Sequence, residues 1–228
     1  MTASSRDQTA NEPTAEERYA EIDRVKAFSD GVFAIIITLL VLELGVPHTE
    51  PGRLLAGLRG EWPSYLAFVL SFVYVGVLWL NHHGLFRHIR EMTLSLNWIN
   101  LGILFGVVII PFPTAVLATA LAGGNYDDLR TAVTFYALMA AIMSAPWLVA
   151  FSYLRRHPTL ATPDLPAHYF RTQTLRPLTG LVLYSLAAVV GWFVNPLLGL
   201  IGIAVMITYH AVTSEGLREG PLGRLMHQ

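Results

Sequence analysis

The residues best suited to chemistry in this sequence are an acid and two histidines within long apolar stretches: Asp30, His82 and His83. A carboxylate together with imidazoles can hold a metal ion or relay protons. The same groups can join neighbouring helices by hydrogen bonds, which is the interpretation we favour. Consecutive helical residues point about 100° apart, so adjacent histidines do not readily face one ion, whereas helical zinc sites place theirs four residues apart. We therefore expect neither a bound metal nor a cofactor.

The composition excludes several other kinds of chemistry. The chain has no cysteine, which excludes disulfides, thiolate metal sites and cysteine nucleophiles. No nucleophile-base-acid set, phosphate loop or cofactor fingerprint is present, so we expect that the protein is not an enzyme. With 15 Lys and Arg against 16 Asp and Glu, the formal charge of −1 offers no basic field, and we expect no nucleic-acid partner.

The elements that must position these residues are membrane-spanning helices. Of the 228 residues, 54% are hydrophobic and only 14% are charged, against roughly a quarter charged in an ordinary soluble domain. Four runs without Asp, Glu, Lys or Arg are each at least as long as the ~18 to 20 residues that cross a bilayer. They cover residues 62–86, 92–126, 131–154 and 177–214. The composition thus excludes a soluble globule and predicts an all-α integral membrane protein.

Six spans follow from these runs and from the apolar segment before Glu43. The run 177–214 is too long for one span, and Asn195-Pro196 divides it into two short helices joined by a tight turn. Prolines within the third and fourth spans should bend them, which a bundle tolerates when neighbouring groups satisfy the freed carbonyls. The expected spans are 24–43, 62–86, 93–122, 131–154, 177–194 and 197–214.

Lysine and arginine residues predict the orientation. With six spans, the N-terminus, the second and fourth loops and the C-terminus share one side, which carries twelve Lys and Arg residues against three on the other. We therefore expect both termini in the cytosol. The expected domain division is a polar tail over 1–20 that becomes helical near Glu16, a six-helix domain over 21–216 and a C-terminal tail over 217–228.

This topology places polar residues of the first three spans at one depth. The first span enters from the cytosol at about Phe28, the second returns to it at about Phe86 and the third leaves it at about Thr93. A carboxylate in the inner third of the bilayer costs on the order of 2.5–3.5 kcal/mol, so Asp30 needs partners at that depth. The polar layer available to it contains Ser29, Trp79, Asn81, His82, His83, Asn97 and Asn100.

An apolar stripe runs along the first span on the side away from Asp30. Counted at about 100° per residue, Leu39 and Leu42 lie within about 40° of Ile35. Thr38 lies within about 60° of Ile35, and Asp30 lies about 140° away. Such a stripe faces lipid, the protein core or a pore, and its periodicity does not distinguish these surroundings.

Three segments of the chain match the pattern of a known family. Residues 24–44 read RVKAFSDGVFAIIITLLVLEL, residues 79–86 read WLNHHGLF, and Leu96-Asn97 is followed by PFPT at 111–114. The first segment closely resembles the first-helix signature of the bacterial relatives of transmembrane protein 175, the endosomal and lysosomal potassium channel family. The other two look like the family's second and third helices. The agreement in motifs covers about residues 24–115, and the rest agrees in helix number and length.

The resemblance implies six helices per chain, cytosolic termini and a homotetramer whose first helices line a central pore without a re-entrant filter. It places the pore constriction at Ile35, Leu39 and Leu42 and a selectivity-related hydroxyl at Thr38. It identifies the structural signature as Arg24, Phe28, Ser29 and Asp30. The supporting polar layer that we expect beside this signature consists of Trp79, His82, His83 and Asn97.

The expected function is a potassium-permeable cation channel of a prokaryotic cytoplasmic membrane. A narrow ring of Ile and Leu acts as a gate because an ion that passes it loses part of its hydration. The expected partners are potassium and other monovalent cations, the lipid bilayer and further copies of the chain. The alternative is a membrane-embedded metal-dependent enzyme or proton relay that uses Asp30, His82 and His83. A secondary transporter is disfavoured because no internal repeat is visible.

Overall fold

The computed structural model describes residues 14–166 and 168–214, and the regular elements of this part of the chain are helices. Six segments are long and apolar enough to cross a membrane, which confirms the predicted all-α architecture and number of spans. The predicted C-terminal tail lies outside the described residues. The α-helices are α1 (Ala15–Leu39), α2 (Leu54–Gly60), α3 (Trp62–Arg87), α4 (Leu94–Ile109), α5 (Pro111–Gly123), α6 (Tyr126–Arg156), α7 (Tyr169–Phe193) and α8 (Pro196–Thr213), with 3-10 helices η2 (Leu40–Glu43) and η3 (Pro158–Leu160).

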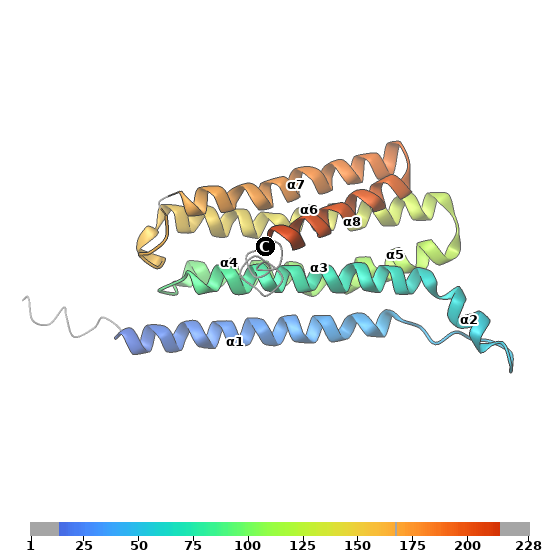
Figure 1. Cartoon of the computed structure of the whole chain (residues 1–228), viewed down its shortest axis with the longest axis horizontal. Coiled ribbons are helices and arrows are strands. Elements are labelled where there is room, and N and C mark those ends of the chain that lie inside the picture. Colours follow the sequence, from blue (N-terminus) through green and yellow to red (C-terminus); the bar gives the residue numbers. More distant parts are fainter. Residues whose placement is uncertain (1–13, 167, 215–228) are drawn as a thin grey trace, which may run out of the picture.

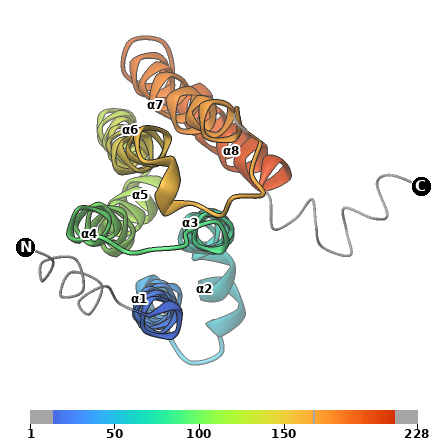
Figure 2. The same cartoon turned by 90° about the vertical axis from the view of Figure 1, so that its left-hand side faces the viewer.

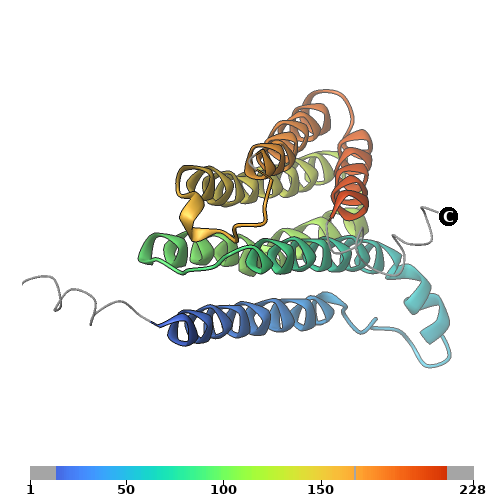
Figure 3. The ribbon, with the colours of Figure 1, turned by 60° about the vertical axis from the view of Figure 1, so that its left-hand side comes forward.

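The helices lie in three layers (Figure 1). In the view along the bundle, α1 lies on one side with the short α2 beside it in projection, α3, α4 and α5 form the middle, and α6, α7 and α8 form the far side (Figure 2). Within the described chain, the helices against which α1 mainly packs are α3 and α4. The short α8 runs obliquely to α6 and α7 (Figure 3). One whole side of α1 therefore faces away from the rest of its own subunit.

Local sequence signals explain where α1 begins and ends. The Thr14 hydroxyl accepts a hydrogen bond from the Glu17 amide, and the Glu17 carboxylate accepts one from the Thr14 amide, a reciprocal cap that satisfies two N–H groups of the first turn. The helix starts next to the predicted Glu16 and so begins within the tail predicted over 1–20. After Leu39 it tightens into η2, and the chain leaves the helix before Gly45 and Pro47.

The prolines of the third span, for which the sequence predicts a bend, divide it into two helices. Pro111 and Pro113 carry no N–H, and α4 ends directly before them while α5 begins at Pro111. The Thr114 hydroxyl donates to the Ile110 carbonyl at 2.7 Å, and the same carbonyl accepts from the Thr114 amide at 3.2 Å. Thr114 is also 2.6 Å from the Ser71 hydroxyl, which ties the break to α3. In contrast, α6 continues as one helix through Pro146.

The structure differs from the prediction in one additional helix and in where several helices begin; α6, for example, starts at Tyr126 and not at residue 131. The segment between the first two spans contains the short helix α2, which the apolar pattern did not indicate. The fifth span was predicted as a short helix from residue 177, whereas α7 begins at Tyr169 and has 25 residues. The prediction began the helix directly after the last charged residue, Arg176, but Arg171 and Arg176 lie within the first two turns of α7. A helix continues into the polar interface because its backbone hydrogen bonds are local.

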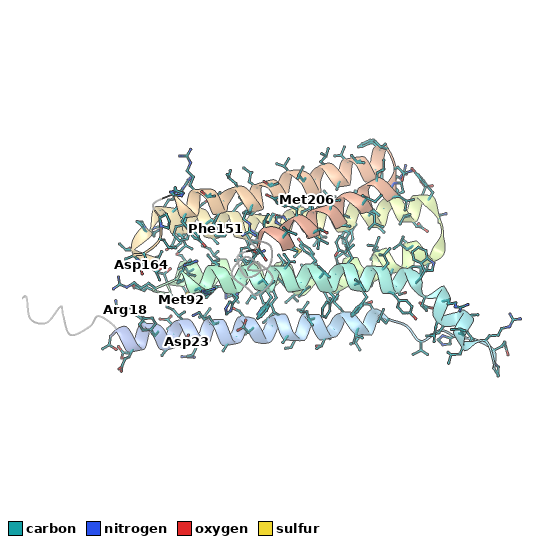
Figure 4. The ribbon with its side chains drawn as sticks, viewed as in Figure 1. Arg18, Asp23, Met92, Phe151, Asp164 and Met206 are labelled. Carbon is teal, nitrogen blue, oxygen red and sulfur yellow. The ribbon has the colours of Figure 1, made fainter. Side chains whose placement is uncertain are left out.

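The connections alternate between the two ends of the bundle. Arg18 near the start of α1, Met92 before α4 and Asp164 after α6 lie at one end, called the N-terminal end here (Figure 4). Two of its connecting segments are hydrogen-bonded to each other: the Arg90 amide donates to the Leu160 carbonyl at 2.8 Å, and the Thr162 amide donates to the His88 carbonyl at 3.0 Å. This alternation is the one that six successive spans require.

Candidate pore-lining helix and its polar support

Helix α1 has two faces with opposite surroundings. One face packs against α3 and α4, and together with the start of η2 it buries five residues to 3% exposure or less: Ile22, Ser29, Phe33, Ile36 and Leu40. The other face carries the predicted stripe, and its members stay exposed in the single subunit, with 58% for Ile35, 39% for Leu39 and 74% for Leu42. Leu42 lies in η2, yet it still faces outward. Within the subunit, the stripe is therefore neither core nor covered.

Thr38 is the hydroxyl-bearing residue of this outward face. Its side chain is exposed, and its hydroxyl donates to the carbonyl of Ile35 at 2.7 Å. Because the hydroxyl proton is donated to a carbonyl of the same helix, the hydroxyl oxygen keeps its lone pairs as acceptors for groups outside the helix. An oxygen presented in this way can accept a hydrogen bond from water or contact a cation.

Asp30 is joined to α3 by one direct hydrogen bond. The indole Nε1 of Trp79 donates to Asp30 Oδ1 at 2.9 Å. The His83 ring lies against the Trp79 ring, with 5.9 Å between the ring centroids. Asp30, Trp79 and His83 are all exposed in the single subunit. The acid thus finds a partner in the predicted layer, at the rim of the contact between α1 and α3.

A second, buried set of hydrogen bonds links α1, α3 and α4. His82 Nε2 and Asn100 Oδ1 are 2.8 Å apart, and Asn100 Nδ2 donates to the Ser29 hydroxyl at 3.1 Å. That hydroxyl donates to the Val25 carbonyl at 2.8 Å. Since an amide oxygen only accepts, His82 carries its proton on Nε2 in this arrangement. Each of the three side chains therefore makes at least one hydrogen bond, as buried polar side chains generally do.

The two histidines face different surroundings. His82 is buried, and its ring stacks on Phe86 with a centroid separation of 4.4 Å, whereas His83 lies at the surface beside Trp79. Asp30 is bonded to Trp79, which lies beside His83, whereas Ser29 is bonded to Asn100, which also bonds His82. In the described residues, no three His, Cys, Asp or Glu side chains are grouped so that they could hold a metal. The geometry therefore favours the hydrogen-bonded clamp.

The two asparagines predicted at this depth differ in their contacts, and two signature residues lie outside the hydrogen-bonded set. Asn100, not Asn97, is the α4 residue that bonds Ser29 and His82. Asn97 is half-buried and makes no side-chain hydrogen bond within the described residues. Arg24 and Phe28 are exposed on α1. Asn100 was detectable because it falls on the buried stripe of α4 together with Leu96, Ile103, Leu104 and Val107.

Comparisons with known proteins agree with this architecture. The profile of the endosomal/lysosomal potassium channel family TMEM175 matches residues 24–111. A potassium channel of Streptomyces collinus is 37% identical over 178 residues, which cover 78% of this chain and 85% of the relative. A potassium channel of Chamaesiphon minutus is 39% identical over 145 residues, or 62% of this chain and 68% of the relative. Neither relative is named as an enzyme.

A solved structure shares the fold over nearly its whole length. The crystal structure of a lysosomal potassium-selective channel TMEM175 homolog from Chamaesiphon minutus matches with a TM-score of 0.75 and 33% identity, and covers 86% of this chain and 99% of that one. The fold is thus that of a six-span membrane protein of the channel class. The chain belongs to the TMEM175 family. It is a multi-pass protein of the prokaryotic cell membrane.

Proposed function

We propose that this chain forms a homotetrameric, potassium-permeable cation channel in which α1 of each subunit lines a central pore. The observation that carries the proposal is the outward face of α1. Its stripe of Ile35, Leu39 and Leu42 is exposed in the subunit, and the chain's relatives from two organisms are named as potassium channels. A closed ring of four identical subunits covers such a face without leaving an open edge.

In this proposal the stripe is the gate. Four copies of Ile35, Leu39 and Leu42 form narrow apolar rings, and an ion that enters them loses water without gaining other ligands. Thr38 lies between these rings and offers the outward-facing hydroxyl oxygen of the stripe. The constriction takes the place of a re-entrant filter, because the connections within the described residues lie at the ends of the helices (Figure 1).

The hydrogen bonds behind α1 hold the gate in register. Asp30 to Trp79 and Ser29 to Asn100 join α1 to two different helices, α3 and α4. Two attachments on different sides limit rotation of α1 about its own axis, which would otherwise move the stripe away from the pore. Both termini lie in the cytosol, the channel domain extends over 21–216, and the tails over 1–20 and 217–228 flank it.

Ion flux through the purified protein tests the proposal. The protein is reconstituted into liposomes of phosphatidylcholine and phosphatidylglycerol, and flux is measured under separate potassium and sodium gradients against empty liposomes. We expect potassium flux that depends on the amount of protein. The same preparation is analysed for zinc and iron. Stoichiometric metal together with flux no higher than in empty liposomes would replace the channel by the metal-dependent enzyme.

A further inference from the structure

Two polar side chains near the N-terminal end of the bundle have no hydrogen-bond partner among the described residues of the subunit. The His83 side chain is exposed on α3 and contacts the Trp79 ring, and Asn97 is half-buried on α4. Both belong to segments that cross the membrane, where hydrocarbon offers neither donors nor acceptors. They therefore indicate a polar partner from outside the subunit.

The two side chains lie at opposite edges of α1. Helix α1 is hydrogen-bonded to Asn100 of α4 through one residue and to Trp79 of α3 through the next. In the view along the bundle, α4 and α3 accordingly lie on either side of α1 (Figure 2). Asn97 is one helical turn from Asn100, and His83 is one helical turn from Trp79. Each edge of the α1 face thus carries one unpaired polar side chain.

The two side chains also lie at nearly the same depth. His82 of α3 and Asn100 of α4 are hydrogen-bonded to each other and so mark a common level. From this level, His83 lies about 1.5 Å toward the N-terminal end and Asn97 lies about 4.5 Å toward it, because α3 and α4 run in opposite directions. The difference in depth is about 3 Å, which side chains of this length can span.

A closed assembly of identical subunits brings these edges together. One edge of each subunit then meets the opposite edge of the next. With α1 nearest the axis, as in the proposed channel on which this inference rests, the α3 edge of one subunit faces the α4 edge of its neighbour. The α4 edge presents exposed apolar side chains at the three- and four-residue spacing of a packing helix, namely Leu94, Trp98, Leu101, Phe105 and Val108.

We propose that Asn97 of each subunit forms a hydrogen bond with His83 of the adjacent subunit. An amide has both a donor and an acceptor, and a neutral imidazole has one of each, so the pair is complementary for either histidine tautomer. A lipid chain in the same position satisfies neither group. Polar side chains of this kind hold transmembrane helices together. Each subunit thus completes the polar layer of the next.

The contact is connected to the proposed gate. The His83 side chain lies against the Trp79 ring, and the Trp79 indole donates to Asp30 of α1. The interface between subunits and the pore-lining helix are therefore joined through one tryptophan. A shift of one subunit against the next acts on α1 of that subunit through this contact.

Cross-linking between two different chains tests the pair. A chain with His83→Cys is expressed together with a chain with Asn97→Cys, and neither contains another cysteine. Directly bonded cysteines need Cα atoms within about 7 Å, so a short bis-thiosulfonate reagent is used to bridge the thiols. Covalent dimers should form when both chains are present and not with either chain alone. Dimers from either chain alone in equal amount would overturn the proposal.

Two further positions control this experiment. Val108→Cys replaces Asn97→Cys as the matched control, because Val108 is exposed on the same edge of α4 but lies about 16.5 Å farther along the helix. Equal trapping of His83→Cys with Val108→Cys would reject a defined register. Leu39→Cys reports the assembly around α1. Dimers through Leu39 without dimers through the pair would reject this contact and leave the channel in place, whereas absence of both would reject the assembly itself.

A double-mutant cycle separates the hydrogen bond from other effects of the two substitutions. Asn97→Leu and His83→Leu should each lower the temperature at which the tetramer dissociates in detergent, followed by size exclusion. Because either substitution removes the same bond, the double variant should dissociate at no lower temperature than the weaker single variant. Circular dichroism should show the helical content of the natural protein in all three. Additive decreases in the dissociation temperature would mean that the two residues act independently and would reject the pair.

Discussion

At the scale of the residue, α1 separates groups that hold the helix from groups that face outward. Ser29 and Asp30 are adjacent in sequence, yet each bonds a different neighbouring helix. The Thr38 hydroxyl donates to the Ile35 carbonyl of α1, and its side chain lies on the outward face of the helix. The proposed channel thus assigns support and conduction to different side chains, and substitutions at these positions should have separable effects.

The apolar ring predicts that polar substitution opens the gate. Replacing Leu42 by Ser or Ile35 by Asn should raise resting potassium flux in liposomes. A ring of polar side chains partly replaces the ion's hydration water and so lowers the free-energy cost of dehydration. Both side chains are exposed in the subunit, so the variants should fold normally. Unchanged flux in both variants, with intact tetramers and equal protein content, would contradict the hydrophobic gate.

The Thr38 hydroxyl predicts a change in preference among cations. Thr38→Ala should reduce discrimination between potassium and sodium and leave the apolar barrier in place, because it removes the hydroxyl oxygen and keeps the neighbouring rings. Thr38→Ser keeps the hydroxyl and serves as the matched control. Flux ratios under potassium and sodium gradients measure the effect, and a ratio that is equal in all three proteins would remove Thr38 from the selectivity position.

Loss of the hydrogen bond between Trp79 and Asp30 should impair folding or assembly. Asp30→Ala removes the acceptor of the Trp79 indole, and a charge-assisted hydrogen bond contributes about 1.5–3 kcal/mol, so the yield and melting temperature of the folded protein should fall. Asp23→Ala is the control, since Asp23 is exposed on the same helix and pairs only with Lys26 in the described structure. A well-folded Asp30→Ala tetramer with altered ion preference would move Asp30 into the pore.

At the scale of the element, close contacts between helices depend on small residues. On α8, a side chain at Gly199 would meet the Gly191 Cα at 2.7 Å and the Ala187 carbonyl oxygen at 2.9 Å, both of them backbone atoms of α7. Backbone atoms cannot move aside as the end of a flexible side chain can. The helical hairpin of α7 and α8 therefore requires glycine at this crossing.

This crossing predicts a stability difference between two glycines. Gly199→Ala should destabilise the protein by about 1–3 kcal/mol through overpacking, seen as a lower melting temperature in detergent. Gly76→Ala on α3 is the control, because nothing lies within 4 Å of the added carbon. Equal melting temperatures for the two variants would show that the hairpin tolerates a wider separation than the structure describes.

At the scale of the whole molecule, the proposed tetramer accounts for the exposed stripe of α1. The α6 to α8 layer lies on the far side of the subunit from α1 (Figure 2). A tetramer with α1 nearest the axis therefore brings the α1 stripes of different chains together and leaves α7 and α8 toward the lipid. Distances between equivalent residues of different subunits should be short only near the axis.

Cysteine cross-linking tests this arrangement directly. The chain contains no cysteine, so a single cysteine introduced at Leu39 or Leu42 is the one thiol per subunit. Oxidation in membranes should trap covalent dimers through either position, since each faces its copies across the axis. A cysteine at the exposed Val182 on α7 is the control and should remain monomeric. Dimers from Val182 alone would place the axis on the opposite side of the subunit.

The amino-acid sequence predicts the six spans, a bend at the prolines of the third span, the division at Asn195 and the apolar stripe of α1. These depend on hydropathy, on chain length against bilayer thickness and on the missing N–H of proline, which are local properties. The family was also visible, because its motif lies in consecutive residues of the first helix.

The tertiary structure alone decided which side chains meet. The common depth of the polar residues followed from topology, but the rotation of each helix is set by packing against its neighbours. That rotation places His82 in the interior and His83 at the surface, and of the two asparagines predicted at this depth it brings Asn100 against His82. It also turned Asn81 away from Asp30 and toward Arg176, a partner 95 residues later in the chain. No local pattern encodes such a contact, because it depends on how three separate helices are turned at once.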